Sequence, residues 1–191
     1  MNDISAGQVP ESADPKVRLT LLGGFELRSV HSGDRAVSMP PDSQRLLAVV
    51  ALRKFPVGRE NAADLLWPRG PRWRAAARLR AAARAARTTG GPLLAAGPGL
   101  ALAAGVVVDH REVVAQVIRT VGAGRATSSM PATVIAQLGQ ELLAGWSDDW
   151  LDADRDRWDR FRRRALIRLV PDASSRRPVA TGVAEPTRRA A

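Results

Sequence analysis

The fold is decided by the stretch RWRAAARLRAAARAAR, residues 72–87. It holds six arginines and no acidic residue, and because alanine and arginine both favour helices, it predicts one long helix. Its apolar residues recur at the spacing of a buried helical stripe: Ala75, Leu79, Ala82, Ala83 and Ala86. We therefore expect a helix that packs along one side against the rest of the chain.

The opposite face of this helix is predicted to be smooth and cationic. Down its middle run Ala77, Ala81 and Ala85, and beside them stand five arginines: Arg74, Arg78, Arg80, Arg84 and Arg87. Small residues let a backbone approach a surface closely, and guanidinium groups fork onto phosphates or onto a guanine edge. The pattern suits the major groove of duplex DNA. Taken alone, the pattern suits a solvated basic face equally well, and the segments before and after the helix must decide between these two interpretations.

Composition and charge restrict the class of partner. The chain has 191 residues, no cysteine and a net charge of +10, which excludes disulfides, thiolate zinc sites and cysteine nucleophiles. Residues 16–108 hold 15 basic and 5 acidic residues, a net of +10, whereas residues 109–191 carry +3 and residues 1–15 carry −3. This excess predicts a polyanionic partner. The basic helix lacks the aromatic and leucine face with which helices lie in lipid, and no apolar run spans a bilayer.

The segments before the basic helix predict a small antiparallel sheet and two helices. Alternating apolar residues over 16–30 and 35–39 are typical of strands. Residues 43–54 predict a largely buried helix with Asp42 or Ser43 as its N-cap. Residues 59–66 predict a short helix that buries three side chains: Ala62, Leu65 and Leu66. Two short helices followed by a longer basic one is the order of a helix-turn-helix.

A hairpin is predicted directly after the basic helix. Residues 93–95 and 100–102 flank a Gly97-Pro98-Gly99 turn, and residues 106–108 are a candidate third strand. A hairpin in this place is a wing. Because it has no basic residue, it predicts packing more than a clamp on phosphates.

A helical region is predicted to begin at Asp109. Asp109 and Glu112 have the spacing of a capping box, and three apolar stripes predict three helices: Val113, Val114, Val117, Ile118 and Val121; Val134, Ile135, Leu138, Leu142 and Leu143; Leu151, Trp158, Phe161, Ala165 and Leu169. Their spacing suggests an array of helical hairpins. The predicted division is a disordered leader (1–15), a first domain (16–108), a helical domain (109–170) and a disordered tail (171–191).

The remaining motifs favour structural roles. Asp152, Asp154 and Asp156 imitate a calcium loop, but arginines occupy its glycine and glutamate positions, so ion pairs are favoured instead: Asp156/Arg160 and Asp159/Arg163. The two histidines, His31 and His110, have no catalytic companions in the sequence. We expect no metal site, no cofactor and no enzymatic activity. The five tryptophans are candidates for base stacking or for core anchors, and we expect core anchors.

Several segments resemble the SARP-type bacterial transcriptional activators. They are VRLTLLGGFELR, SQRLLAVVALR, LLWPRGP, Leu79-Arg80, VVVDHREV and ELLAGWSDDWLDADRDRW, between residues 17 and 170. That family joins an OmpR-type winged helix to a bacterial transcriptional activator domain (BTAD) of TPR-like helices. The resemblance implies an α+β winged helix-turn-helix over 16–108 followed by an all-α TPR-like segment. It also implies a cytoplasmic, nucleoid-associated regulator that activates transcription.

The resemblance assigns partners as well. It implies binding of promoter DNA through the third helix, with seven arginines as candidate contacts: Arg74, Arg78, Arg80, Arg84, Arg87, and near helix starts Arg45 and Arg59. It implies RNA polymerase as a partner of the Trp67–Pro71 loop, and a homodimer on direct repeats.

The chain departs from the family pattern at the third helix and in length. Ala83 and Ala86 stand where the family usually has large apolar residues, and Arg84 stands where it often has an aromatic residue. Arg69 stands where the family commonly has an acid after Trp67-Pro68. The helical domain stops after three helices. These departures keep an alternative open: a shortened or decayed regulator that works as a protein–protein or dimerisation module through residues 109–170, without DNA readout.

Overall fold

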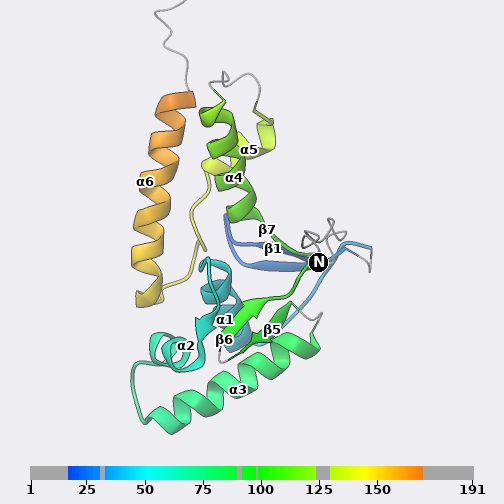
Figure 1. Cartoon of the computed structure of the whole chain (residues 1–191), viewed down its shortest axis with the longest axis vertical. Helices are drawn as coiled ribbons and strands as arrows, with labels where there is room; N and C mark the ends of the chain where they lie inside the picture. The colour runs from blue at the N-terminus through cyan, green and yellow to red at the C-terminus, as the bar shows by residue number, and fades with distance from the viewer. Residues whose placement is uncertain (1–16, 31–32, 90–91, 98, 124–129, 170–191) are drawn as a thin grey trace, which may run out of the picture.

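A computed structural model of the protein describes residues 17–30, 33–89, 92–97, 99–123 and 130–169. The predicted leader and tail and His31 lie outside the described residues. The described part is α+β, with small sheets in the middle of an elongated molecule and helices toward both ends (Figure 1). None of its helices is long and apolar enough to cross a membrane.

The first sheet has four strands in the order β3-β2-β1-β7. β1 (Val17–Thr20) pairs antiparallel with β2 (Glu26–Ser29), and β2 pairs antiparallel with β3 (Arg35–Ala36), which confirms the predicted strands. β7 (Val106–Val108) pairs parallel to β1. The antiparallel pairing predicted for the first three strands is confirmed, and β7 makes the sheet mixed, because β1 offers it a free edge that only the tertiary fold brings near.

The second sheet contains the predicted hairpin. β5 (Leu93–Ala96) and β6 (Gly99–Leu102) pair antiparallel, and β6 also pairs with a short strand β4 (Val57–Gly58). A Cβ on Gly99 would lie 3.0 Å from the Val57 carbonyl oxygen, so the close approach of β4 requires glycine there. The expectation that residues 106–108 extend this hairpin is wrong, since they join the first sheet.

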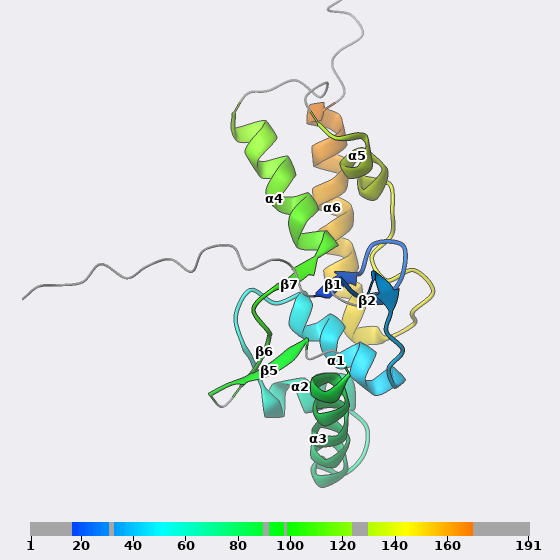
Figure 2. The same ribbon diagram turned by 90° about the vertical axis from the view of Figure 1, so that its right-hand side faces the viewer.

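Three helices surround the second sheet. They are α1 (Pro41–Ala51), α2 (Arg59–Leu66) and α3 (Arg72–Thr88). The bounds of α2 are those predicted, and α3 is one residue longer than predicted. α1 and α2 pack against the same side of α3, which lies at one end of the molecule (Figures 1 and 2).

The start of α1 differs from the prediction. The N-cap residue is Pro40, and Pro41 follows in the first turn, where its missing N–H costs no helical hydrogen bond. Asp42 and Ser43 are therefore inside the helix, and neither caps it. Their side chains reach α3 instead, as described below.

The helical region contains α4 (Asp109–Gly122), α5 (Ala132–Leu138) and α6 (Asp152–Leu169), with a 3₁₀ turn at Asp149–Leu151 before α6. The second predicted helix was expected to continue through Leu143. The helix ends at Leu138, because the residues that follow it pair with the chain just after β1.

The residues after α5 pair with the first sheet. Leu142 forms an isolated antiparallel bridge with Leu22, and the Leu143 N–H donates to the Leu21 carbonyl at 2.7 Å. Leu143 has φ +49°, a left-handed conformation that a right-handed α-helix does not contain. The apolar spacing was correct for burial, since Leu142 and Leu143 are both buried, but it did not indicate a helix.

Asp109 joins the helical region to the first sheet. Its buried carboxylate accepts hydrogen bonds from the N–H groups of Leu21 (2.9 Å) and Leu22 (3.0 Å), and from the next N–H of α4 (2.6 Å). Burial raises the pKa of Asp109, and the three N–H donors oppose that rise. The predicted capping box with Glu112 is wrong, because this carboxylate faces the end of β1.

Two arginines fasten the helical region to α1. Arg111 of α4 donates to carbonyl oxygens at the end of α1, including those of Ala51 at 2.9 Å and Arg53 at 2.7 Å. The Arg53 guanidinium pairs with the buried Asp154 of α6 at 2.8 Å.

β7 runs directly into α4, and buried residues of both halves form one core. The division at residues 108 and 109 stays a prediction.

Charged side chains along α6 pair at i,i+3. Arg157 lies 2.6 Å from Asp154, and Arg162 lies 2.7 Å from Asp159. The predicted i,i+4 pairs, Asp156/Arg160 and Asp159/Arg163, are not formed in the described α6. The Asp159 carboxylate pairs with Arg162 instead, and Arg163 donates to the Asp159 backbone carbonyl at 3.3 Å.

Candidate nucleic-acid interface

The buried stripe of α3 is confirmed. The buried residues of this helix are the five that were predicted: Ala75, Leu79, Ala82, Ala83 and Ala86. Leu79 is the one large side chain among them and is 3% exposed. The buried Ser43 hydroxyl of α1 donates to the Ala82 carbonyl oxygen at 3.0 Å, which holds the middle of α3 on α1.

The outer face of α3 is open. Ala77 and Ala81 are exposed, and Ala85 is half-buried. Four of the six arginines of this helix are exposed and form no ion pair with any residue that the structure describes: Arg74, Arg80, Arg84 and Arg87. Arg72 lies 3.9 Å from Asp64, a long and exposed pair. The helix therefore keeps most of its positive charge unpaired.

Arg78 is the exception. Its Nε and Nη2 donate to the two carboxylate oxygens of Asp42 at 3.0 and 2.9 Å. Its guanidinium also lies 4.9 Å from the centre of the Trp67 ring. A bidentate pair stacked on an indole fixes the guanidinium more firmly than a single contact would. In this structure Arg78 joins α3 to α1 and to the loop before α3.

Arg45 is also held within the molecule. Its Nε lies 3.0 Å from Asp148 of the helical region, and its Nη1 lies 4.0 Å from Asp42. Asp42 is thus shared by Arg45 and Arg78. Both arginines were predicted to contact DNA, and for both of them these carboxylates compete with a phosphate.

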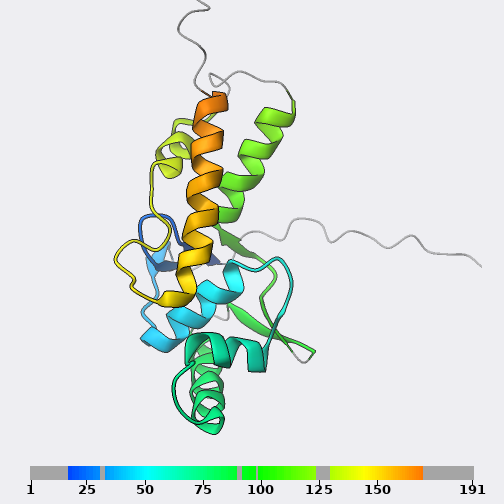
Figure 3. The ribbon, with the colours of Figure 1, turned by 90° about the vertical axis from the view of Figure 1, so that its left-hand side faces the viewer.

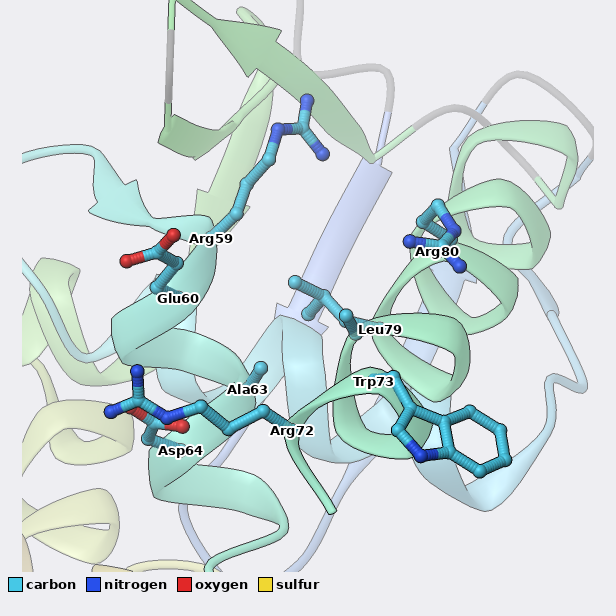
Figure 4. Close-up of a pocket in the computed structure, with 9 residues that line it drawn as sticks. Arg59, Glu60, Ala63, Asp64, Arg72, Trp73, Leu79 and Arg80 are labelled. Carbon is cyan, nitrogen blue, oxygen red and sulfur yellow. The ribbon is translucent and has the colours of Figure 1, made fainter.

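The remaining predicted residues form one edge of the site. At 100° per residue, Arg80, Arg84 and Arg87 project from the same side of α3, and they are exposed. Arg59 of α2 lies across a gap from Arg80 (Figure 4). We call Arg59, Arg80, Arg84 and Arg87 the basic edge. Arg59 and Arg80 line the same hollow between α2 and α3, and Arg74 lies nearer the opposite side of α3.

Trp73 differs from the other tryptophans. Trp67 and Trp158 are buried and Trp146 and Trp150 are half-buried, as expected of core anchors, but the Trp73 side chain is 66% exposed. The Arg74 guanidinium lies 5.1 Å from its ring centre. A helical wheel already turns Trp73 away from the stripe and toward Arg80. Sequence reasoning missed it because the tryptophans were treated as one group.

The hairpin supplies packing beside α3. β6 contacts α1, β5 contacts α3, and Leu100 of β6 is fully buried. The hairpin has no basic residue, so its side chains add no positive charge to the surface beside α3.

His110 is half-buried at the start of α4. Its ring packs edge-on against Trp158, with centres 5.0 Å apart, and burial lowers its pKa to about 4. The imidazole is therefore neutral at physiological pH. Among the residues that the structure describes, no three histidine, aspartate or glutamate side chains are placed to hold a metal ion.

Comparison with solved structures shows a likeness to a known protein. No family model matches the sequence, and no curated protein matches it. The solved structure of Mycobacterium tuberculosis EmbR in complex with a low affinity phosphopeptide is similar to this chain, with 21% sequence identity and a TM-score of 0.46. The match covers 80% of this chain and 42% of that chain, so this chain spans less than half of that protein's length.

Proposed function

We propose that the protein is a DNA-binding transcriptional regulator whose α3 enters the major groove of promoter DNA. One observation carries the proposal: α3 is packed on α1 and α2 along its alanine stripe and turns a smooth face with four unpaired arginines to solvent. A recognition helix needs both a fixed frame and free cations, and the packed stripe and exposed arginines of α3 supply both.

The dimensions of α3 agree with this use. Its 17 residues span about 25 Å at the rise of an α-helix. Ala77 and Ala81 at the centre of the exposed face let its backbone enter the roughly 12 Å wide groove deeply. The arginines on either side then reach phosphates or guanine edges.

The arginines divide into two roles in this proposal. The basic edge supplies contacts from Arg80, Arg84 and Arg87 on α3 and from Arg59 at the start of α2. Arg74 adds a contact from the other side of α3. Arg78 and Arg45 serve first as braces through Asp42, and their contact with DNA requires release from it.

The resemblance to SARP-type activators supplies the finer assignment. On this proposal residues 16–108, with both sheets and α1–α3, are a winged helix-turn-helix, and α4–α6 belong to a BTAD of TPR-like helices. The protein acts in the bacterial cytoplasm on the nucleoid. RNA polymerase binds the loop before α3, where Pro68, Arg69 and Gly70 are exposed while Trp67 is buried. Two copies bind direct repeats.

A salt titration with a matched control tests the proposal. The triple variant R80Q/R84Q/R87Q removes three charges from α3, and R160Q/R163Q/R164Q removes three exposed charges from α6. Fluorescence anisotropy with a labelled duplex measures the affinity of each. Each lost phosphate contact lowers the slope of log K against log salt by about 0.9.

The slope for the α3 variant is therefore expected to be shallower than that of the wild type by about 2.7. Between about 50 and about 200 mM salt, its affinity then falls about 40-fold less than the affinity of the wild type does. The α6 variant is expected to keep the wild-type slope. Equal losses in both variants would reduce the proposal to general charge attraction, and no binding to any duplex at low salt would reject it.

A second candidate function follows from α4 and α6. Ile118 and Ile167 are 60% and 77% exposed, and Ile135 of α5 is also exposed. Large aliphatic side chains on the helical region favour a protein–protein or dimerisation module without DNA readout. Sedimentation of the full chain, with I118S/I167S as the comparison, tests it. A monomer at all concentrations, with no change in the variant, would count against dimerisation.

A further inference from the structure

A cavity of about 540 Å³ lies between α2 and α3 (Figure 4). Its floor is apolar and consists of Ala63, Ala76 and Leu79. The exposed Trp73 stands beside it, and Arg59 and Arg80 stand at its mouth. None of the roles proposed above accounts for this hollow.

The cavity exists because small residues face each other between the two helices. Ala63 of α2 and Ala76 of α3 leave space that larger side chains would fill, and Leu79 alone closes the bottom. The size of the cavity lies in the range of small-molecule sites, which are largely apolar with a few polar groups that orient the ligand.

The charged groups around the cavity favour an anion. Arg59 and Arg80 have no ion-pair partner among the described residues. Of the two acids on the lining, Asp64 is 3.9 Å from Arg72, and Glu60 points away from Leu79 (Figure 4). The lining carries the three guanidiniums of Arg59, Arg72 and Arg80 against the two carboxylates of Glu60 and Asp64, an excess of one positive charge.

We propose that this cavity binds a small aromatic carboxylate. The ring lies on the floor of Ala63, Ala76 and Leu79 beside the Trp73 indole. The carboxylate accepts a forked pair of hydrogen bonds from Arg80, with Arg59 as the second cation. Charge complementarity and the planar apolar surface together select this ligand class over a neutral or cationic one.

Occupation of the cavity opposes DNA binding. This consequence rests on the proposed function, because Arg59 and Arg80 belong to the basic edge. A bound carboxylate neutralises them and holds its ring beside the first turns of α3. The ligand and the duplex therefore compete for the same two guanidiniums.

Calorimetric titration of the full chain with 2-naphthoate tests the site without DNA. The expected result is saturable binding at one site at millimolar concentration. A76L fills the cavity without changing any charge, and we expect binding to weaken about 10-fold or more. R80Q removes the fork, with an expected loss of about 10-fold. R84Q is the matched control, because Arg84 is on the basic edge but not on the cavity lining.

The controls separate the cavity from general attraction. R84Q is expected to bind 2-naphthoate as the wild type does, and the neutral 2-naphthamide is expected to bind more weakly than the anion. Circular dichroism verifies that A76L is folded, and R80Q gives an independent reading because Arg80 is exposed. No binding of 2-naphthoate, or equal binding by the wild type, A76L and R80Q, would overturn the inference.

A competition experiment distinguishes this inference from the proposed function. Adding 2-naphthoate to a protein–duplex complex is expected to release the duplex from wild type and not from A76L. If 2-naphthoate binds but no duplex does, the cavity stands and the proposed function fails. If the duplex binds but 2-naphthoate does not, the proposed function stands and the cavity inference fails.

Discussion

Replacement of Leu79 by alanine removes the one large side chain by which α3 is anchored. The other four buried positions of the helix are alanines, so a variant L79A keeps the backbone contacts and the Ser43–Ala82 hydrogen bond but leaves α3 with only methyl groups against α1 and α2. The change tests whether the recognition helix is held by this stripe.

The expected loss follows from the position of Leu79. A buried Leu→Ala change costs about 2–5 kcal/mol, and the upper part of that range comes from closed cavities that cannot relax. Leu79 is 3% exposed, but it forms the floor of a cavity that opens to solvent. Water enters the enlarged space, so we expect the lower part of the range, about 2–3 kcal/mol.

Urea denaturation followed by far-ultraviolet circular dichroism measures the free energy of unfolding. The matched control is I167A, which also shortens an aliphatic side chain to alanine but at a position that is 77% exposed. It is expected to cost less than about 0.5 kcal/mol. A loss below about 1 kcal/mol for L79A, or equal losses for the two variants, would refute the claim that Leu79 anchors α3.

Three further predictions concern charged and titrating groups. D42N is expected to free Arg78 and steepen the salt dependence of duplex binding by about 0.9 in slope; an unchanged slope in anisotropy titrations would leave Arg78 outside the interface. D109N loses an acceptor for buried backbone N–H groups, and we expect urea denaturation to show a loss of about 2 kcal/mol. The pKa of His110 is about 4 in the folded protein, below its ordinary value near 6.5 in the unfolded chain. The contribution of His110 to the free energy of unfolding is therefore complete above about pH 6.5, and it falls by up to about 1.4 kcal/mol per pH unit as the pH drops from there toward 4. Denaturation over this pH range is expected to give a flatter curve for H110Q.

The parts of the fold that follow from local periodicity were predictable. The bounds of α2, the stripe of α3 and the pairing of β5 with β6 all depend on residues near each other in sequence. In the case of α3, alanine and arginine have high helix propensity, and a single leucine fixes which face is buried. Nothing elsewhere in the chain needs to override these preferences.

The parts that depend on distant partners were not predictable. β7 has the sequence of a hairpin extension, but it pairs with β1, which lies far from it in the chain. Asp109 has capping-box spacing, but its carboxylate binds the N–H groups at the end of β1. Leu142 and Leu143 continue a helical spacing, yet they pair with that same strand end. The free edge and end of one strand explain all three differences.

The candidate site also combines features that follow from local sequence with features that depend on distant residues. Its helix and its cations were visible in the sequence, because charge and spacing are local properties. The Asp42–Arg78 pair was not visible, since it joins residues on two helices. The cavity beside Trp73 was not visible either, because it arises from alanines on α2 and α3 that only packing brings together.

Selection of bound duplexes from a random library, followed by dimethyl sulfate protection of the selected sequence, tests the central claim most directly. Guanine N7 lies in the major groove, where α3 is proposed to bind. We predict enrichment of a sequence whose guanine N7 atoms are protected by the wild type and exposed again with R80Q/R84Q/R87Q. No enrichment at low salt, or protection confined to adenine N3 in the minor groove, would contradict the account.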